Sequence, residues 1–168
     1  SKDEKLLIFF NGEIYNYKEL REELVKKGFQ FKTNSDTEVV LHMFEAYGDE
    51  MLMRLRGMFT LSIYNTETKN LFIARDFFGI KPLYYLTHDE KIIAFSSEIK
   101  SFLKVPNFKA KVNSNAVLNY LSFQYNPLQE TFFEGVYKLL PGHFLKIDTN
   151  TGKAVIKKYW SFEFAPNS

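Results

Sequence analysis

Residues 5–16 read KLLIFFNGEIYN, and this stretch decides how the chain is expected to fold. Residues 6–10 form an uninterrupted apolar run, which is typical of a buried strand. The run stops at Asn11-Gly12-Glu13, and Asn-Gly is a turn dipeptide because both residues tolerate a positive φ. We therefore expect a strand that ends at Asn11 and turns there.

The three residues at this turn carry groups that suit chemistry on an amide. Asn11 offers a side-chain amide, Gly12 a backbone N–H and Glu13 a carboxylate. Two neighbouring donors can hold a developing oxyanion, and a carboxylate beside them can hold a substrate ammonium. Asn-Gly alone fits an ordinary hairpin equally well. However, residues 16–19 begin a helical pattern, so the stretch is a strand, a turn and a helix start.

Three motifs follow one another along the chain: NGEIYN at 11–16, TNSDTEV at 33–39 and RDFFGIKPLYY at 75–85. In this order they resemble the glutaminase half of glutamine-dependent asparagine synthetases, which are class II glutamine amidotransferases with an N-terminal nucleophile. The resemblance runs from about Lys5 to Trp160. It implies an α+β fold of the N-terminal-nucleophile type: a four-layer sandwich of two stacked antiparallel sheets flanked by helices, incomplete at the N-terminus.

The resemblance also implies roles for four residues. The Asn11 side chain and the Gly12 backbone would form an oxyanion hole. Glu13 and Asp36 would hold the α-ammonium of the substrate glutamine. Two structural roles stay open beside these: Glu13 as a surface turn acid, and Asp36, with Ser35, as a helix N-cap.

The nucleophile is expected to lie outside this chain. The family uses a cysteine as its first residue, and this sequence has no cysteine. Ser1 is an unsuitable substitute, because NGEIYN normally lies several dozen residues after the nucleophile. The family's carboxylate-binding arginine also falls in the missing part. We expect this stretch alone to be inactive.

The expected domain organisation follows from these missing parts. Residues 1–160 would form a partial glutaminase domain, in which a hairpin turn at 2–5 precedes the first strand. Residues 161–168 would be a linker towards an absent ATP-dependent synthetase domain. No cofactor is expected in this chain, whereas ATP and magnesium are expected for the absent domain.

Residues 75–83 are expected to be structural. Arg75 and Asp76 would form an ion pair at a strand end, Gly79 a turn, and Pro82 would fix the start of the next strand. The segment 97–100 would cap a helix or contact another domain.

Hydrophobic periodicity predicts the other elements. It indicates helices over 16–27, 35–47 and 113–120, shorter helical segments over 49–55 and 97–103, and strands over 29–32, 58–64, 71–75, 84–87, 92–96, 143–147 and 154–159. Residues 122–135 are expected to be a loop.

Composition narrows the function classes. Apolar residues make up 45% of the chain, which favours a folded domain over a disordered one. The 22 basic and 20 acidic residues nearly balance, which argues against nucleic acid as a partner. No apolar run approaches the roughly 18 residues of a membrane helix, and no signal peptide opens the chain. His42, His88 and His143 are too scattered for a metal site. We expect a cytoplasmic protein that self-associates through exposed sheet edges.

The leading interpretation is part of an asparagine synthetase-like enzyme, in which glutamine hydrolysis supplies ammonia for ATP-dependent amidation of aspartate. Its partners would be glutamine and its own synthetase domain. One alternative is the same plan acting on another carboxylate, in polysaccharide or secondary metabolism. Another is a non-catalytic interaction module without the nucleophile. A Met-Cys start several dozen residues upstream would favour the enzyme.

Overall fold

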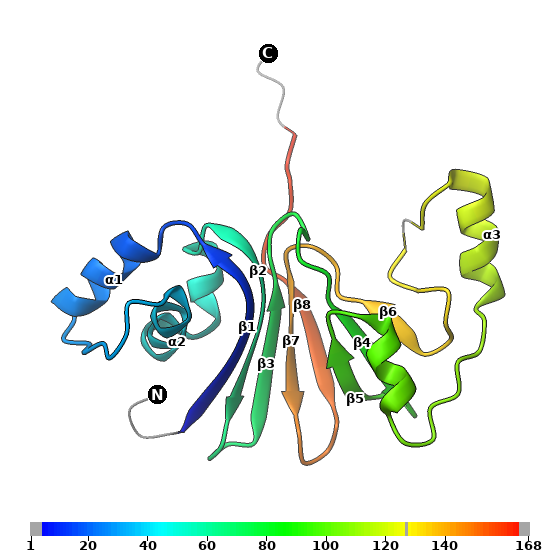
Figure 1. Ribbon diagram of the computed structural model, residues 1–168, viewed down its shortest axis with the longest axis horizontal. Coiled ribbons are helices and arrows are strands. Elements are labelled where there is room, and N and C mark those ends of the chain that lie inside the picture. The colour runs from blue at the N-terminus through cyan, green and yellow to red at the C-terminus, as the bar shows by residue number, and fades with distance from the viewer. Residues whose placement is uncertain (1–4, 127, 165–168) are drawn as a thin grey trace.

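Two antiparallel sheets form the centre of the protein. The computed structural model describes residues 5–126 and 128–164. One sheet has the strand order β1-β2-β3-β7-β8 and the other β5-β4-β6 (Figure 1). The strands are β1 (Leu6–Ile14), β2 (Gly57–Asn65), β3 (Asn70–Arg75), β4 (Tyr84–His88), β5 (Lys91–Ser96), β6 (Val136–Lys138), β7 (His143–Asp148) and β8 (Ala154–Lys158).

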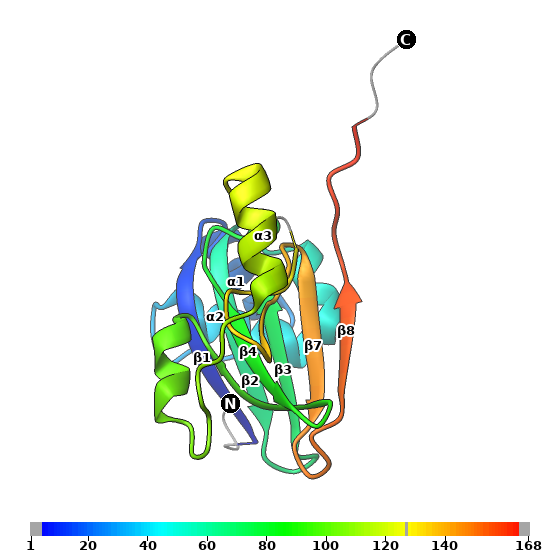
Figure 2. The ribbon, with the colours of Figure 1, turned by 90° about the vertical axis from the view of Figure 1, so that its right-hand side faces the viewer.

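The helices lie outside the two sheets. They are α1 (Tyr17–Lys26), α2 (Asp36–Tyr47), the 3-10 helices η1 (Gly48–Met53) and η2 (Ile99–Lys104), and α3 (Ser114–Phe123). Helices α1 and α2 lie beside the five-stranded sheet, and the three-stranded sheet lies on the other side with α3 beyond it (Figures 1 and 2). The expected α+β arrangement of two antiparallel sheets with flanking helices is confirmed.

Alternating side chains along the strands build three apolar cores between these layers. In β3, Phe72 packs into the core under α1 and α2, whereas its neighbour Ile73 packs between the two sheets. In β4, Tyr85 shares that inter-sheet core, and Leu86 packs on the opposite face with Phe102 of η2. The period of two therefore sets the layer order, because β3 and β4 each bury side chains on both of their faces.

The expected end of the first strand at Asn11 is wrong. Strand β1 continues to Ile14 and pairs with β2 throughout, with Gly12 opposite Phe59 and Ile14 opposite Gly57. A Cβ on Gly12 would lie only 2.1 Å from the Met58 carbonyl oxygen. Glycine is thus needed here for close approach of two strands and not for a turn. The chain turns later, at residues 15–16.

The strand expected over 29–32 is also wrong. The backbone N–H groups of Lys32 and Thr33 donate to the Glu38 carboxylate, and no strand partner lies beside them in the described part of the chain. Helix α3 extends beyond its expected end, and the three-residue strand β6 was too short to give a periodic signal. Residues 2–4 of the expected N-terminal turn and 165–168 of the expected linker lie outside the described residues. No described helix combines the length and apolar character that crossing a membrane requires.

The expected ion pair between Arg75 and Asp76 is replaced by bonds to the backbone. The Arg75 guanidinium donates to the carbonyls of Lys81, Leu139 and Gly79 at 2.7, 2.6 and 2.6 Å. The Asp76 carboxylate is fully buried and accepts four backbone N–H groups, those of Phe59, Phe78, Ile80 and Lys81 at 3.0–3.3 Å. The motif is structural, as expected, but each charge is satisfied by main chain.

Asp76→Asn should lower the free energy of unfolding by about 2–4 kcal/mol, because a carboxamide has one acceptor oxygen and its NH₂ would face N–H donors. Asp89→Asn is the matched control. Asp89 lies in an exposed turn with a φ of 49°, which asparagine tolerates. Asp89→Asn should therefore change the free energy of unfolding by no more than about 0.5 kcal/mol. Urea unfolding of both variants checks this. Equal stabilities would contradict a central role for Asp76.

Candidate functional site

The four residues singled out in the sequence line one cavity. Asn11, Gly12 and Glu13 come from the end of β1, and Asp36 opens α2. The cavity has a volume of about 460 Å³. Its remaining lining residues are Tyr17, Asn34, Ser35, Met58 and Lys81. The structure therefore brings together two segments that are separate in sequence.

The backbone of β1 presents a free donor at this cavity. Within the described residues, β1 is an edge strand that pairs only with β2. The Lys5 carbonyl accepts from the Thr66 N–H, and the Tyr15 N–H donates to the Arg56 carbonyl. The backbone N–H and C=O groups of odd-numbered residues in β1 therefore point towards β2. Even-numbered residues must then point away from β2, because the two directions alternate along an antiparallel strand. The Gly12 N–H therefore points out of the sheet edge.

Asp36 is tied to the same edge. The Ile14 N–H, which points in the same direction as that of Gly12, donates to Asp36 Oδ2 at 3.1 Å. The N-cap of α2 is Ser35, whose hydroxyl accepts from the Glu38 N–H at 3.3 Å. The capping role left open for Asp36 thus falls to Ser35. Asp36 instead links the helix start to β1.

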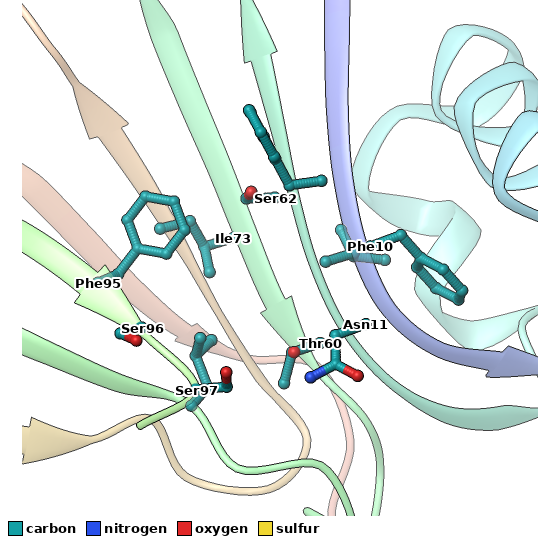
Figure 3. A pocket seen from close by; sticks show the side chains of 11 residues that line it. Phe10, Asn11, Thr60, Ser62, Ile73, Phe95, Ser96 and Ser97 are labelled. Carbon is teal, nitrogen blue, oxygen red and sulfur yellow. The ribbon is translucent and has the colours of Figure 1, made fainter. Parts of the chain in front are cut away.

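The Asn11 side chain lies on the inner face of the five-stranded sheet. It lines a second, smaller cavity of about 170 Å³ together with its cross-strand partner Thr60. Figure 3 shows Asn11 beside Thr60, with Ser96 and Ser97 on the opposite side of this cavity. The buried Ser62 hydroxyl also lines it and has no hydrogen-bond partner among the described residues. Asn11 thus stands between the two cavities.

Sequence reasoning missed Lys81, which lines the larger cavity. Its N–H donates to Asp76 Oδ2 at 3.1 Å and its carbonyl accepts from Arg75 Nε at 2.7 Å. The two structural charges therefore fix the backbone from which Lys81 reaches the cavity. The signal was present within RDFFGIKPLYY, but the motif was interpreted as wholly structural. The lining now combines two carboxylates, Glu13 and Asp36, with one cation.

The described residues hold no group of three or more His, Asp or Glu side chains that could bind a metal ion. The chemistry that this lining offers comes from hydrogen-bond donors, carboxylates and an ammonium. Such a set suits a small polar ligand that carries an ammonium group, because ionised carboxylates accept charge-assisted hydrogen bonds.

Comparison with known proteins identifies the relatives of this chain. Residues 1–160 match the glutamine amidotransferase domain family. The chain is 44% identical over 165 residues to asparagine synthetase (glutamine-hydrolysing) 1 of Bacillus subtilis (strain 168). The aligned region covers 98% of this chain and 26% of that protein. It is 36% identical over 168 residues to asparagine synthetase (glutamine-hydrolysing) 2 of the same organism, covering 97% and 22% respectively.

A solved structure shares the fold. The glutamine phosphoribosylpyrophosphate amidotransferase of B. subtilis superposes with a TM-score of 0.63 at 20% identity, over 92% of this chain and 29% of that one. In all three comparisons the chain spans about a quarter of the relative's length.

Gly12→Ala should cost about 3 kcal/mol or more of unfolding free energy, because its Cβ would meet backbone atoms, which cannot move aside. Gly48→Ala is the control. Gly48 has a φ of 57° and open space around it, so the same change should cost only the left-handed penalty of about 1–2 kcal/mol. Urea unfolding measures both. An equal loss would show that β1 and β2 tolerate separation at Gly12.

Proposed function

Because the chain belongs to the glutamine amidotransferase domain family, we propose that it forms the glutamine-binding part of a glutamine-hydrolysing asparagine synthetase. The observation that carries this proposal is the convergence of Asn11, Gly12, Glu13 and Asp36 on one cavity. The resemblance of the motifs to asparagine synthetases implies an oxyanion hole at Asn11 and Gly12 and an ammonium-binding pair at Glu13 and Asp36.

The proposed reaction is hydrolysis of the glutamine side-chain amide. A cysteine thiolate supplied from outside these 168 residues attacks the amide carbon, so a C–S bond forms and the carbonyl becomes an oxyanion. The nucleophile's own α-amine accepts the thiol proton and passes it to the leaving nitrogen, so collapse of the oxyanion breaks the C–N bond and releases ammonia. Water then cleaves the thioester and releases glutamate.

Asn11 and Gly12 would stabilise the oxyanion in both steps. The Gly12 N–H is suited to this because it points out of the sheet edge and is not used in pairing with β2. The Asn11 side chain can add a second donor from the next residue. Each such donor typically lowers the barrier by about 2.7–4 kcal/mol.

Glu13 and Asp36 would hold the α-ammonium of glutamine. Asp36 Oδ2 accepts from the Ile14 N–H, and Asp36 Oδ1 accepts a long bond of 3.4 Å from the Thr37 hydroxyl. Oδ1 can also accept a charge-assisted hydrogen bond from the substrate. Glu13 lies one residue beyond Gly12 and lines the same cavity. Binding the ammonium here would place the far end of glutamine against the oxyanion donors.

The remainder of the enzyme would use the ammonia. The relatives are about four times as long as this chain, which supports a fused synthetase domain beyond it. In the proposal, residues 161–168 lead to that domain, which binds ATP and magnesium and amidates aspartate. Aspartate as the acceptor rests on the names of the relatives.

The purified 168-residue chain should release no glutamate from glutamine, because it has no cysteine to form the thioester. A coupled glutamate assay over several hours measures this. Release of glutamate by the 168-residue chain that is abolished by Asn11→Ala would show that the chain contains a complete glutaminase site.

In the complete polypeptide that carries this domain, Asp36→Ala should reduce glutamine-driven asparagine synthesis by about 10–100-fold, the effect of one lost charge-assisted bond. Ammonia-driven synthesis should be unchanged, because free ammonia bypasses glutamine binding. Asp89→Ala, at an exposed turn, serves as the control. Equal loss of both activities in Asp36→Ala would rule out its ammonium-binding role.

A further inference from the structure

Glu38 has a carboxylate that serves the segment before α2. Its Oε1 accepts from the Lys32 N–H at 2.7 Å, and its Oε2 accepts from the Thr33 N–H at 2.7 Å and the Thr33 hydroxyl at 2.6 Å. Its side chain is only 16% exposed. A residue three positions after a serine N-cap usually returns its carboxylate to the N-cap N–H. Glu38 instead reaches two and three residues further back.

Segment 32–35 depends on side chains for its shape. Outside the bonds of helix α2 itself, no backbone–backbone hydrogen bond involves these residues in the described part of the chain. Beside Glu38, the Arg21 guanidinium holds the Thr33 carbonyl at 2.6 Å, and the Thr33 hydroxyl lies 3.0 Å from that of Ser35. Asn34 and Ser35 line the larger cavity and lead directly into Asp36. The path of this segment therefore sets where Asp36 lies.

His42 supports Glu38 from one helical turn further on. Its Nε2 lies 3.8 Å from Glu38 Oε1, and its Nδ1 lies 2.5 Å from Glu45 Oε2. The rings of Phe29 and Phe31 contact the imidazole, with centroids 5.2 and 4.9 Å away. The Glu38 carboxylate is thus enclosed between a packed imidazole and the segment that it holds.

The ionised form of Glu38 fits this task. Burial raises the pKa of its carboxyl, but the hydrogen bonds from Lys32 and Thr33 and the neighbouring His42 lower it, and the net pKa lies below the ordinary 4.5. The carboxylate is therefore ionised at neutral pH and acts only as an acceptor, as three converging donors require. A carboxamide would turn its NH₂ towards an N–H.

We propose that Glu38 is a positioning residue of the glutamine site: without touching the substrate, it holds segment 32–35 so that Asp36 lies at the β1 edge. This inference rests on the proposed function. The alternative is that Glu38 merely stabilises the first turn of α2 through the helix dipole. A helix-stabilising role would change overall stability without separating glutamine use from ammonia use.

The test compares Glu38→Gln with Glu45→Gln in the complete enzyme. Both changes remove a carboxylate that faces His42, but only Glu38 contacts segment 32–35. Glu38→Gln should raise KM for glutamine about tenfold, with kcat and ammonia-driven synthesis within about twofold of wild type. Glu45→Gln should leave all three values within about twofold. Thr33→Val removes the hydroxyl that donates to Glu38, that contacts the Ser35 hydroxyl and that accepts from the Ser35 N–H. It should raise KM about threefold, and it serves as the second test if Glu38→Gln does not fold.

The outcomes separate this inference from the proposed function. If the wild-type enzyme uses glutamine and both Glu38→Gln and Thr33→Val have the same KM for glutamine as the wild type, the positioning role is overturned and the proposed function is not. Parallel loss of glutamine-driven and ammonia-driven activity would do the same, in favour of the helix-stabilising role. A wild-type enzyme with ammonia-driven but no glutamine-driven activity would overturn the proposed function, and the inference with it.

Discussion

The buried Asp76 carboxylate is the interaction on which the arrangement of this protein depends. Burying a charge costs several kcal/mol unless hydrogen bonds replace its hydration, and here four backbone N–H groups do so. One of them belongs to Phe59, which pairs with Gly12 in β1. The others shape the turn that ends at Lys81. The backbone of Asp76 adds bonds to Phe59 and Gly142. A single residue thus connects β2, the cavity-lining turn and the segment before β7.

The position of the site at a sheet edge has a chemical consequence. Inside a sheet, every N–H is used by a neighbouring strand, whereas alternate N–H groups of an edge strand stay available. The Ile14 N–H donates to the Asp36 carboxylate, and the Gly12 N–H faces the cavity. In the proposed enzyme this would be an oxyanion donor. The self-association expected from an open sheet edge stays a prediction.

Much of the fold could be predicted from sequence because its signals are local. Periods of two and 3.6, the Ser35 cap and the polar turns located most strands and helices, and the motif order indicated the family. The errors arose where distant contacts overrode local preference. Asn11-Gly12 has turn chemistry, yet pairing with β2 keeps it extended. Phe29 and Phe31 alternate like a strand, yet both pack on His42.

The sequence named four candidate site residues but not their geometry, and their roles in binding glutamine stay predictions. Asn11, Gly12, Glu13 and Asp36 came from motif resemblance, and their common cavity required the fold. Lys81 was hidden because the backbone bonds that aim it involve side chains of other residues. The most direct measurement is a crystal structure of the complete enzyme with bound L-glutamate, the proposed product. The α-ammonium should lie between the Glu13 and Asp36 carboxylates, with a side-chain carboxylate oxygen facing the Gly12 N–H and the Asn11 amide. Glutamate bound elsewhere, or a Gly12 N–H that donates to a protein carbonyl in that complex, would contradict the account.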